Sequence, residues 1–404
     1  MKVVQINAVY QYSSTGRTTM EMHESLQKLG IDSYVFCTNT MKPEEQIYQI
    51  GKKLDYKIHG FCSRLFGTQG CFSILSTSNL LNRLRQIEPD VVILRNLHAN
   101  YINVPMLLGF LAKNNIVTIN VLHDCWSYTG HCCYYTEDCC SKWQTECYHC
   151  PILDKYNSSW FFDKSTKMFR MKKAGFSKLK NLAVIGVSKW IANEAKQSPV
   201  FSNAKVIKHI YNWINLNVFN PRKTDELRLK LGLCNDDFIV LGVSQKWSDY
   251  KGLNHFKDIA KEMYDVKFLM VGYMPEGVEL PTNIISVPPV SSPDVLAQYY
   301  SLGDVFLNFS IQETFGKVTA EALACGTPLI VNNATANPEL CGNGCGYVID
   351  NNDHFQIINA INIIRRDGKS AYSDKCRAFA QENFGKNKGI DSYVSLFIEL
   401  TGKQ

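Results

Sequence analysis

The segment Ser310–Pro328 reads S-I-Q-E-T-F-G-K-V-T-A-E-A-L-A-C-G-T-P and is the most informative stretch of this 404-residue chain. The apolar run Val305–Phe309 precedes it, and Gly316 permits a tight turn before the helix-forming residues Lys317–Ala324. We therefore predict a strand, a turn and a helix that stops at Gly326. The free N–H groups at such a helix start, with roughly +0.5 of an elementary charge from the aligned peptides, form a site for a phosphate group.

Two glutamates flank this predicted turn. Glu313 precedes it, and Glu321 follows on the first turns of the helix. At these places Glu321 can accept both hydroxyl groups of a ribose, and Glu313 can hold hydroxyl groups at the sugar end of a bound diphospho-sugar. A bare Glu-x7-Glu pair often occurs by chance in helices. The preceding strand and the following Ala-Cys-Gly-Thr-Pro make the whole string far more specific.

From Glu313 to Pro328 the sequence closely resembles the retaining GT-B glycosyltransferases of family four, the glycosyltransferase group 1 type. The resemblance implies an α/β protein of two facing Rossmann-like domains, with parallel sheets and an interdomain cleft. It also implies division of the donor site among named residues: Glu313 for the transferred sugar, Glu321 for the ribose, and Phe315, Gly316, Lys317 and Val318 for the diphosphate.

Two lysines follow the predicted strand Phe238–Val243. Lys246 and Lys251 are separated by four residues, where family members carry an arginine and a lysine aimed at the donor diphosphate. A hydrogen bond to a charged group contributes about 1.5–3 kcal/mol. Its strength would grow as the leaving diphosphate gains charge. Lys246 lacks the bidentate fork of arginine, so we expect it to contact the diphosphate with a different hydrogen-bond geometry.

The resemblance assigns further residues to the first domain. His123 directly follows the predicted strand Val117–Leu122, and a histidine at this place in the family lies near the donor sugar and its leaving group. Asp124 next to it either faces the cleft or orients the histidine. The turn predicted at Ser13–Gly16 corresponds to a glycine-rich loop of the family, so Gly16 and Arg17 are candidate donor contacts.

Alternation of apolar strands and helices runs along both halves of the chain. Near-continuous apolar runs such as Val91–Leu94 indicate buried strands of parallel sheets that helices cover on both faces. We predict an N-terminal Rossmann-like acceptor-side domain at residues 1–214, with a Cys-rich insertion at 125–151. The nucleotide-sugar-binding domain then covers residues 215–385, and a helix within 386–404 packs back toward the N-terminal domain.

The cysteines need an explanation of their own, because the chain has fifteen, seven of them between Cys125 and Cys150. This insertion resembles a subset of the family found in bacterial surface-polysaccharide and colanic-acid clusters. Cys132, Cys139 (or Cys140), Cys147 and Cys150 could supply four thiolates to a structural zinc, with Cys147-x-x-Cys150 as the strong half of the pattern. Disulfides and plain reduced thiols are the alternatives. Such a metal would do no chemistry.

A basic stretch follows the insertion: Lys164, Lys167, Arg170, Lys172, Lys173, Lys178 and Lys180, interleaved with apolar residues. It is either a solvated helix face or a surface held near anionic lipid or an anionic acceptor. The amino terminus does not read as a signal peptide, and no apolar run approaches the roughly 18 residues of a transmembrane helix. We expect a cytoplasmic protein, at most peripheral on the inner face of the membrane.

These observations predict transfer of a sugar from a nucleotide diphosphate, UDP-sugars first and GDP-sugars second, to a glycan or lipid-linked hydroxyl with retention. Absence of an Asp-x-Asp motif favours catalysis without a metal or other cofactor. A sugar-nucleotide epimerase or hydrolase of the same fold is the alternative. A zinc-braced nucleic-acid-binding protein is disfavoured by the modest net charge of +6, so we expect no nucleic-acid partner. A nicotinamide dehydrogenase is disfavoured because no Gly-x-Gly-x-x-Gly follows the first strand.

Overall fold

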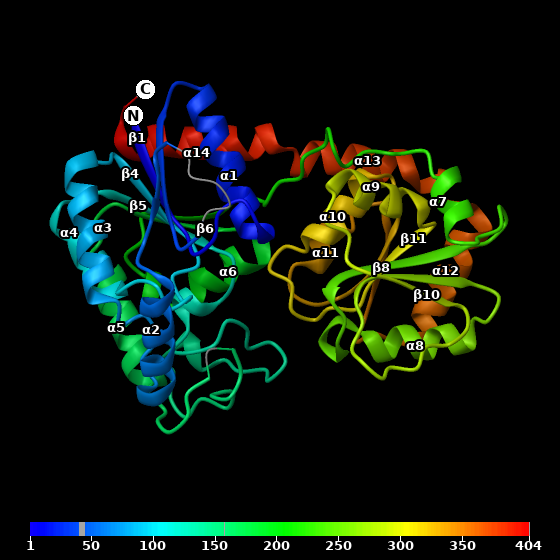
Figure 1. The fold of residues 1–404 in the computed structure, drawn as a ribbon, viewed down its shortest axis with the longest axis horizontal. Coiled ribbons are helices and arrows are strands. Elements are labelled where there is room, and N and C mark those ends of the chain that lie inside the picture. Colours follow the sequence, from blue (N-terminus) through cyan, green and yellow to red (C-terminus); the bar gives the residue numbers. More distant parts are fainter. Residues whose placement is uncertain (40–44, 157, 404) are drawn as a thin grey trace. The chain divides into compact units, whose positions relative to one another are not determined.

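The computed structural model describes residues 1–39, 45–156 and 158–403, and the chain divides into two compact units. Unit 1 comprises Met1–Tyr211 with Ile390–Gln404, and unit 2 comprises Asn212–Gly389. Each unit is an α/β domain whose strands pair in parallel, with helices on both sides of the sheet (Figure 1). None of the helices in the described ranges combines the length and apolar character needed to cross a bilayer.

Unit 1 has a seven-stranded sheet in the order β3-β2-β1-β4-β5-β6-β7. Its strands are β1 (Lys2–Ile6), β2 (Asp32–Cys37), β3 (Ile47–Gln49), β4 (Val91–Leu94), β5 (Val117–Leu122), β6 (Leu182–Gly186) and β7 (Val206–His209). Its helices are α1 (Ser13–Lys28), α2 (Lys53–Phe66), α3 (Ile74–Ile87), α4 (Val104–Lys113), α5 (Ser165–Phe176), α6 (Lys189–Gln197) and most of α14 (Lys386–Thr401). Strands β4, β5 and β6 are buried at every residue, which explains their continuous apolar sequence.

Unit 2 has a six-stranded sheet in the order β10-β9-β8-β11-β12-β13. Its strands are β8 (Ile239–Lys246), β9 (Lys267–Tyr273), β10 (Ile284–Val287), β11 (Val305–Asn308), β12 (Leu329–Asn332) and β13 (Gly346–Ile349). Its helices are α7 (Asp225–Lys230), α8 (Leu253–Glu262), α9 (Pro293–Leu302), α10 (Lys317–Ala324), α11 (Asn337–Leu340), α12 (His354–Asp367) and α13 (Ser370–Phe384).

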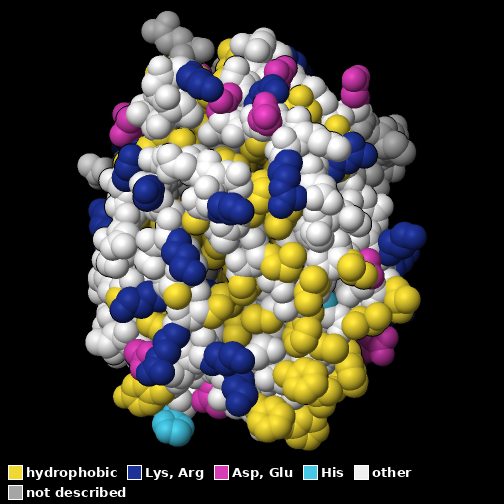
Figure 2. All heavy atoms as spheres, turned by 90° about the vertical axis from the view of Figure 1, so that its left-hand side faces the viewer, with side chains coloured by type: hydrophobic (Ala, Val, Ile, Leu, Met, Phe, Trp, Pro, Cys, Tyr) yellow, Lys and Arg dark blue, Asp and Glu magenta, His cyan; other side chains and the backbone are white. Residues whose placement is uncertain are grey.

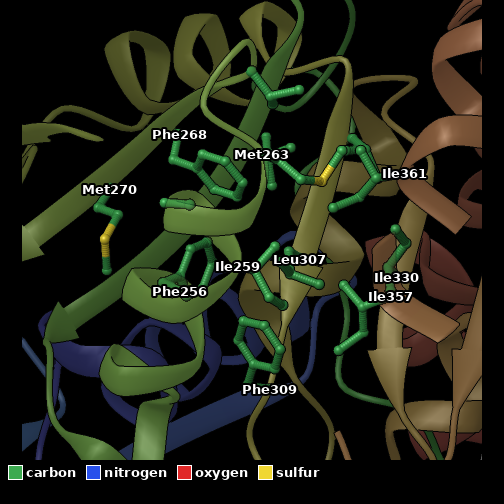
Figure 3. Close-up of a cluster of buried hydrophobic side chains, with 14 of the residues drawn as sticks. Phe256, Ile259, Met263, Phe268, Met270, Leu307, Phe309, Ile330, Ile357 and Ile361 are labelled. Carbon is green, nitrogen blue, oxygen red and sulfur yellow. The ribbon is translucent and has the colours of Figure 1, made fainter. Parts of the chain in front are cut away.

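An apolar core between α8, α12 and the sheet fixes the segment that follows β11 (Figure 3). Phe309, directly after β11, packs edge-on against Phe256 of α8 with ring centroids 5.0 Å apart. The same ring stacks on His255 at 5.1 Å. Because Phe309 is anchored on both sides, the chain leaves the core at a fixed point before it reaches Glu313.

Several predicted elements have the predicted bounds, namely β4, β5 and α10. The turn predicted at Ser13–Gly16 is wrong, because these residues form the first turn of α1. The Ser188 hydroxyl caps α6 by accepting from the N–H of Ile191. Lys251 ends the short 3-10 turn Asp249–Lys251, and α8 begins at Leu253.

Candidate active site

The turn between β11 and α10 is built around a glycine with left-handed backbone geometry. Gly316 has φ = 83°, which glycine adopts without strain, and α10 begins at the next residue. Lys317 and Val318 are the first two residues of that helix and are half-buried. The Phe315 side chain lies in the core, with its ring 5.4 Å from that of Phe384. Any contribution of Phe315 to a ligand must therefore come from its backbone.

A network of amide and hydroxyl side chains braces the segment from Asn308 to Ser310. The Asn308 carboxamide accepts from the N–H of Ser310 at 2.9 Å and donates to Thr319 Oγ1 at 3.0 Å. The Asn337 amide donates to the carbonyl of Ser310 at 2.6 Å. Asn337 and Thr319 are fully buried, so these hydrogen bonds hold the turn rigidly. The sequence alone did not identify this network.

Two of the predicted site residues are in direct contact. The ammonium of Lys251 donates to Glu313 Oε1 at 2.6 Å, and its contact with Ser310 Oγ is 3.4 Å. The backbone of Glu313 is fixed as well, since its N–H donates to Thr335 Oγ1 at 3.0 Å. Lys246 is the last residue of β8 and is exposed. A cation and a carboxylate therefore lie together just before a helix N-terminus.

Glu321 lies within α10 and is only 2% exposed. The hydroxyl group of Tyr300, on α9, donates to Glu321 Oε2 at 2.9 Å. A buried carboxylate is costly unless it is hydrogen-bonded. Tyr300 is a positioning residue that the sequence did not reveal, because it lies on another helix.

In unit 1, the ring of His123 has a buried arginine as its partner. His123 directly follows β5, and Arg95 directly follows the neighbouring strand β4. Arg95 Nη1 lies 2.9 Å from His123 Nε2. A guanidinium group has no acceptor, so Nε2 accepts and the neutral ring carries its proton on Nδ1. Burial lowers the pKa of Arg95 from its usual value, yet a guanidinium remains charged at neutral pH.

Asp124 orients the chain after His123 and pairs with His98. Its Oδ2 lies 2.7 Å from His98 Nε2, and its Oδ1 accepts from the N–H of Trp126 at 2.8 Å. Burial alone would raise the pKa of Asp124, but the charge and hydrogen bond of His98 outweigh burial and lower it. Asp124 therefore fixes the start of the Cys-rich insertion.

Gly16 and Arg17, the candidate donor contacts of unit 1, lie in the first turn of α1. A Cβ atom at Gly16 would stand 3.3 Å from backbone atoms of Tyr10 and Val9. Glycine at this position therefore serves close packing of the chain against itself. Contact of either residue with a donor stays a prediction.

Four of the insertion's cysteines line one small cavity of about 20 Å³: Cys132, Cys140, Cys147 and Cys150. Cys139, which we named first for the third position, is exposed, and its Sγ contacts the carbonyl of Thr136 at 3.7 Å. The side chain of Cys140 takes that position instead. All fifteen cysteines are free thiols.

The basic stretch does not form a uniform surface. Lys167, Lys173, Lys178 and Lys180 are exposed, and Arg170 forms an ion pair with Glu146. Lys172, however, is completely buried on α5. Neither reading of the stretch, as a solvated face or as a membrane face, applies to Lys172.

Replacing Arg95 with methionine should lower the rate of the predicted sugar transfer about tenfold or more, because His123 loses the charged donor that fixes its tautomer. Steady-state kinetics measure the effect. Arg83→Met, at an exposed arginine of α3, is the matched control and should keep the rate of the parent protein. Equal rates for the two variants would contradict the role of Arg95.

Comparison with known proteins identifies the family. Residues 15–218 match the model described as Glycosyltransferase Family 4, which covers half of the chain, and residues 238–367 match the model described as Glycosyl transferases group 1. This chain belongs to glycosyltransferase family 4. The two matches fall on different units, so both units carry the family's sequence pattern.

Among individual family 4 relatives, N-acetyl-alpha-D-glucosaminyl L-malate synthase of Bacillus anthracis is 24% identical over 54% of this chain and 59% of its own length. Alpha-galactosylglucosyldiacylglycerol synthase of Streptococcus pneumoniae is 30% identical over 31% of this chain and 38% of its own. The chain thus spans about half the length of these relatives or less.

A solved structure shows the fold. Anabaena HepE, in a crystal structure with UDP and glucose, superimposes with a TM-score of 0.68 at 15% identity, covering 99% of this chain and 100% of that one. The predicted fold class, two Rossmann-like domains with parallel sheets of the GT-B type, is confirmed.

Proposed function

We propose that this family 4 protein is a retaining glycosyltransferase. It moves a sugar from a nucleotide diphosphate sugar, UDP-sugars first and GDP-sugars second, to a hydroxyl group of a glycan or lipid-linked acceptor, in surface polysaccharide biosynthesis. The observation that carries the proposal is the 2.6 Å ion pair between Lys251 and Glu313, directly before the Gly316 turn and the start of α10. A cation, a carboxylate and a helix N-terminus together suit a diphosphate attached to a sugar.

The proposed chemistry follows from the charges at the site. As the sugar–phosphate bond breaks, negative charge grows on the leaving diphosphate, and Lys251, Lys246 and the α10 N-terminus stabilise it. The departing phosphate oxygen takes the proton of the acceptor hydroxyl, which attacks from the same face. Glu313 holds the sugar hydroxyls and Glu321 the ribose. No added metal ion is needed, because the protein supplies the positive charge.

Support for this assignment comes from the names of the relatives. The two curated relatives are synthases of a glucosaminyl malate and of a glycosylated diacylglycerol, and the solved neighbour holds UDP. The UDP complex favours a UDP-sugar donor. The diacylglycerol-linked relative favours an acceptor at a lipid surface.

A donor screen tests the proposal. The purified chain is incubated with UDP- and GDP-sugars and lipid-linked or oligosaccharide acceptors, and release of nucleoside diphosphate is followed with and without EDTA. NMR of the product gives the anomeric configuration. One donor should support release that depends on acceptor and resists EDTA, and Glu313→Ala should abolish most of it. Full activity in that variant, or an inverted product, would contradict the assignment.

The epimerase or hydrolase alternative predicts a different result with donor alone. Without acceptor, a transferase should release nucleoside diphosphate only slowly. Rapid stoichiometric conversion of the donor to an epimer, or to free sugar, would instead establish the alternative.

We further propose that an anionic membrane is the partner of unit 1. Figure 2 shows apolar side chains gathered next to Lys and Arg side chains on the face that carries α2, α3 and α5. Phe61 on α2 meets Trp160 edge-on at 5.8 Å, and Trp160, Phe161 and Phe162 follow as an exposed aromatic series. Lys164 lies over the ring of Phe162 at 5.3 Å. Aromatic groups beside cations suit the headgroup region of an anionic bilayer.

Replacing both Phe161 and Phe162 with serine should weaken binding to phosphatidylglycerol-containing vesicles by more than tenfold, because burying one aromatic side chain contributes about 1.5–3 kcal/mol. Vesicle co-sedimentation at two salt concentrations measures the effect. Phe355→Ser removes an 81% exposed phenylalanine of unit 2 and serves as the control. Equal binding by all three proteins would contradict the proposed membrane contact.

A further inference from the structure

Four cysteines of the insertion line a space that holds a single small atom. Cys132, Cys140, Cys147 and Cys150 line the cavity of about 20 Å³, which is room for one water-sized particle. They come from separate turns of a segment with little regular structure. We infer that these four cysteines bind one structural metal ion, Zn²⁺, which ties the insertion together. This inference concerns stability and is independent of the donor.

Hydrogen bonds hold the backbone around each cysteine. The indole of Trp143 donates to the carbonyl of Cys140 at 3.0 Å. Lys142 donates to the carbonyls of Tyr148 and His149 at 3.1 and 2.8 Å, which pins the turn between Cys147 and Cys150. The cavity lining selects Cys140 over the exposed Cys139, and the Lys142 contacts shape a Cys-x-x-Cys turn of the kind that structural zinc sites use.

Two further hydrogen bonds hold the backbone at Cys150 and at Cys132. The N–H of Cys150 donates to Asp163 Oδ2 at 2.8 Å, and the Thr129 hydroxyl donates to the carbonyl of Cys132 at 2.6 Å. A Cβ atom at Gly130 would stand 2.4 Å from the carbonyl oxygen of Ser165 and 2.7 Å from Cys147 Cβ. Only a glycine at position 130 therefore allows the backbone to lie this close to Cys147.

One peptide group links a buried cation to a cysteine sulfur. The ammonium of Lys172 donates to the carbonyl of Thr129 at 2.8 Å, and the N–H of the same peptide, from Gly130, donates to Cys147 Sγ at 3.1 Å. Polarisation of a peptide by a cation strengthens what its N–H donates. Such a donor suits a metal-bound thiolate better than a neutral thiol, which is a weak acceptor.

Lys172 is a buried amine without a carboxylate partner in the described part of the chain. Its side chain is completely buried, it lies 3.5 Å from the centroid of a Trp126 ring, and among the described residues no carboxylate oxygen comes within 4.0 Å of its nitrogen. A Zn²⁺ ion with four thiolates carries two net negative charges and would suit a buried lysine as a neighbour. Four sulfur ligands around space for one ion favour zinc over harder cations and over a cluster.

Zinc binding would draw the four sulfur atoms inward. In the described part of the chain, three metal-ligating atoms lie within 4.8 Å of one another only at His98, Asp124 and Cys133. There the His98 and Asp124 atoms already bond to each other at 2.7 Å. No three sulfur atoms of Cys132, Cys140, Cys147 and Cys150 lie within that limit, so zinc binding requires these side chains to rotate toward the cavity.

Metal analysis of the full-length chain, purified without added metal, tests the inference. Elemental mass spectrometry should find about one zinc per chain in the parent, in Cys139→Ser and in Cys234→Ser. Replacement of Cys132, Cys140, Cys147 or Cys150 by serine should lower the content at least severalfold. Loss of zinc from Cys139→Ser with retention in Cys140→Ser would overturn the ligand set. A metal-free parent that takes up no Zn²⁺ would overturn the site.

A cysteine variant that fails to fold would lose its metal for another reason, so the parent protein supplies a second measurement. X-ray absorption at the zinc edge should show four sulfur neighbours at about 2.3 Å. Fewer sulfurs, or iron in place of zinc, would overturn the assignment. Lys172→Met should release zinc to a chelator faster than the parent does, whereas Lys173→Met, at the exposed neighbour, should match the parent. Equal release from both would overturn the role of Lys172.

Discussion

Replacing Lys251 with methionine should lower kcat/KM for sugar transfer by about 10²- to 10³-fold, the range typical for removal of one group that stabilises developing charge. The ammonium lies 2.6 Å from Glu313 Oε1, in the segment that precedes α10, so its loss removes a side-chain cation from the site. Most of the effect should appear in kcat, because the charge on the diphosphate increases only as the bond breaks. Steady-state kinetics with the best donor measure the split.

Glu313→Gln and the double variant test whether the two side chains act together. If Glu313 both holds the sugar and orients Lys251, the two losses should not add, and the double variant should be little worse than the poorer single one. Lys261→Met, at an exposed lysine of α8, is the control and should keep full activity. A Lys251 variant with near-normal kcat but lowered stability would assign the ion pair to the fold alone.

The core strands and α10 could be predicted because their local signals agree with their surroundings. β5 is an uninterrupted apolar run that is buried at every position, and α10 lies between two glycines with positive φ, Gly316 and Gly326. The start of α1 could not be predicted. Its buried residues include Gly16, Thr18 and Thr19, which do not read as an apolar helix face. The hydroxyl groups of Thr18 and Thr19 donate to carbonyl groups of the helix backbone, and the bond from Thr19 to the carbonyl of Thr15 is 2.9 Å long.

The residues that hydrogen-bond to the site residues could not be predicted from the sequence, for a different reason. Arg95 is 28 positions from His123 and Tyr300 is 21 from Glu321, and only the sheet and helix packing bring each pair together. Lys172 gave a misleading signal, since a lysine in a basic stretch is usually solvated. The choice between Cys139 and Cys140 depended on which side chain lines the cavity, which adjacent cysteines in a sequence cannot reveal.

Replacing Gly252 with alanine should destabilise unit 2 by about 2–5 kcal/mol, combining backbone strain with a clash in the core. Gly252 directly follows Lys251 and has φ = 80°, and an added Cβ would stand 2.3 Å from Cβ of Phe309. Phe309 cannot retreat easily, because it packs between Phe256 and His255. The displacement would also move Lys251, so transfer activity should fall along with the free energy of unfolding, which urea denaturation measures.

Gly232→Ala separates the two causes. Gly232 has a similar φ of 68°, but its added Cβ would meet nothing within 4 Å. In Gly232→Ala, the free energy of unfolding should therefore fall only by the cost of left-handed backbone geometry, about 1–2 kcal/mol. The variant should keep its activity. The difference between the two variants measures the contact with Phe309. Equal losses of unfolding free energy in the two variants would mean that Phe309 moves aside without cost. In that case the position of Lys251 beside Glu313 would not depend on Gly252.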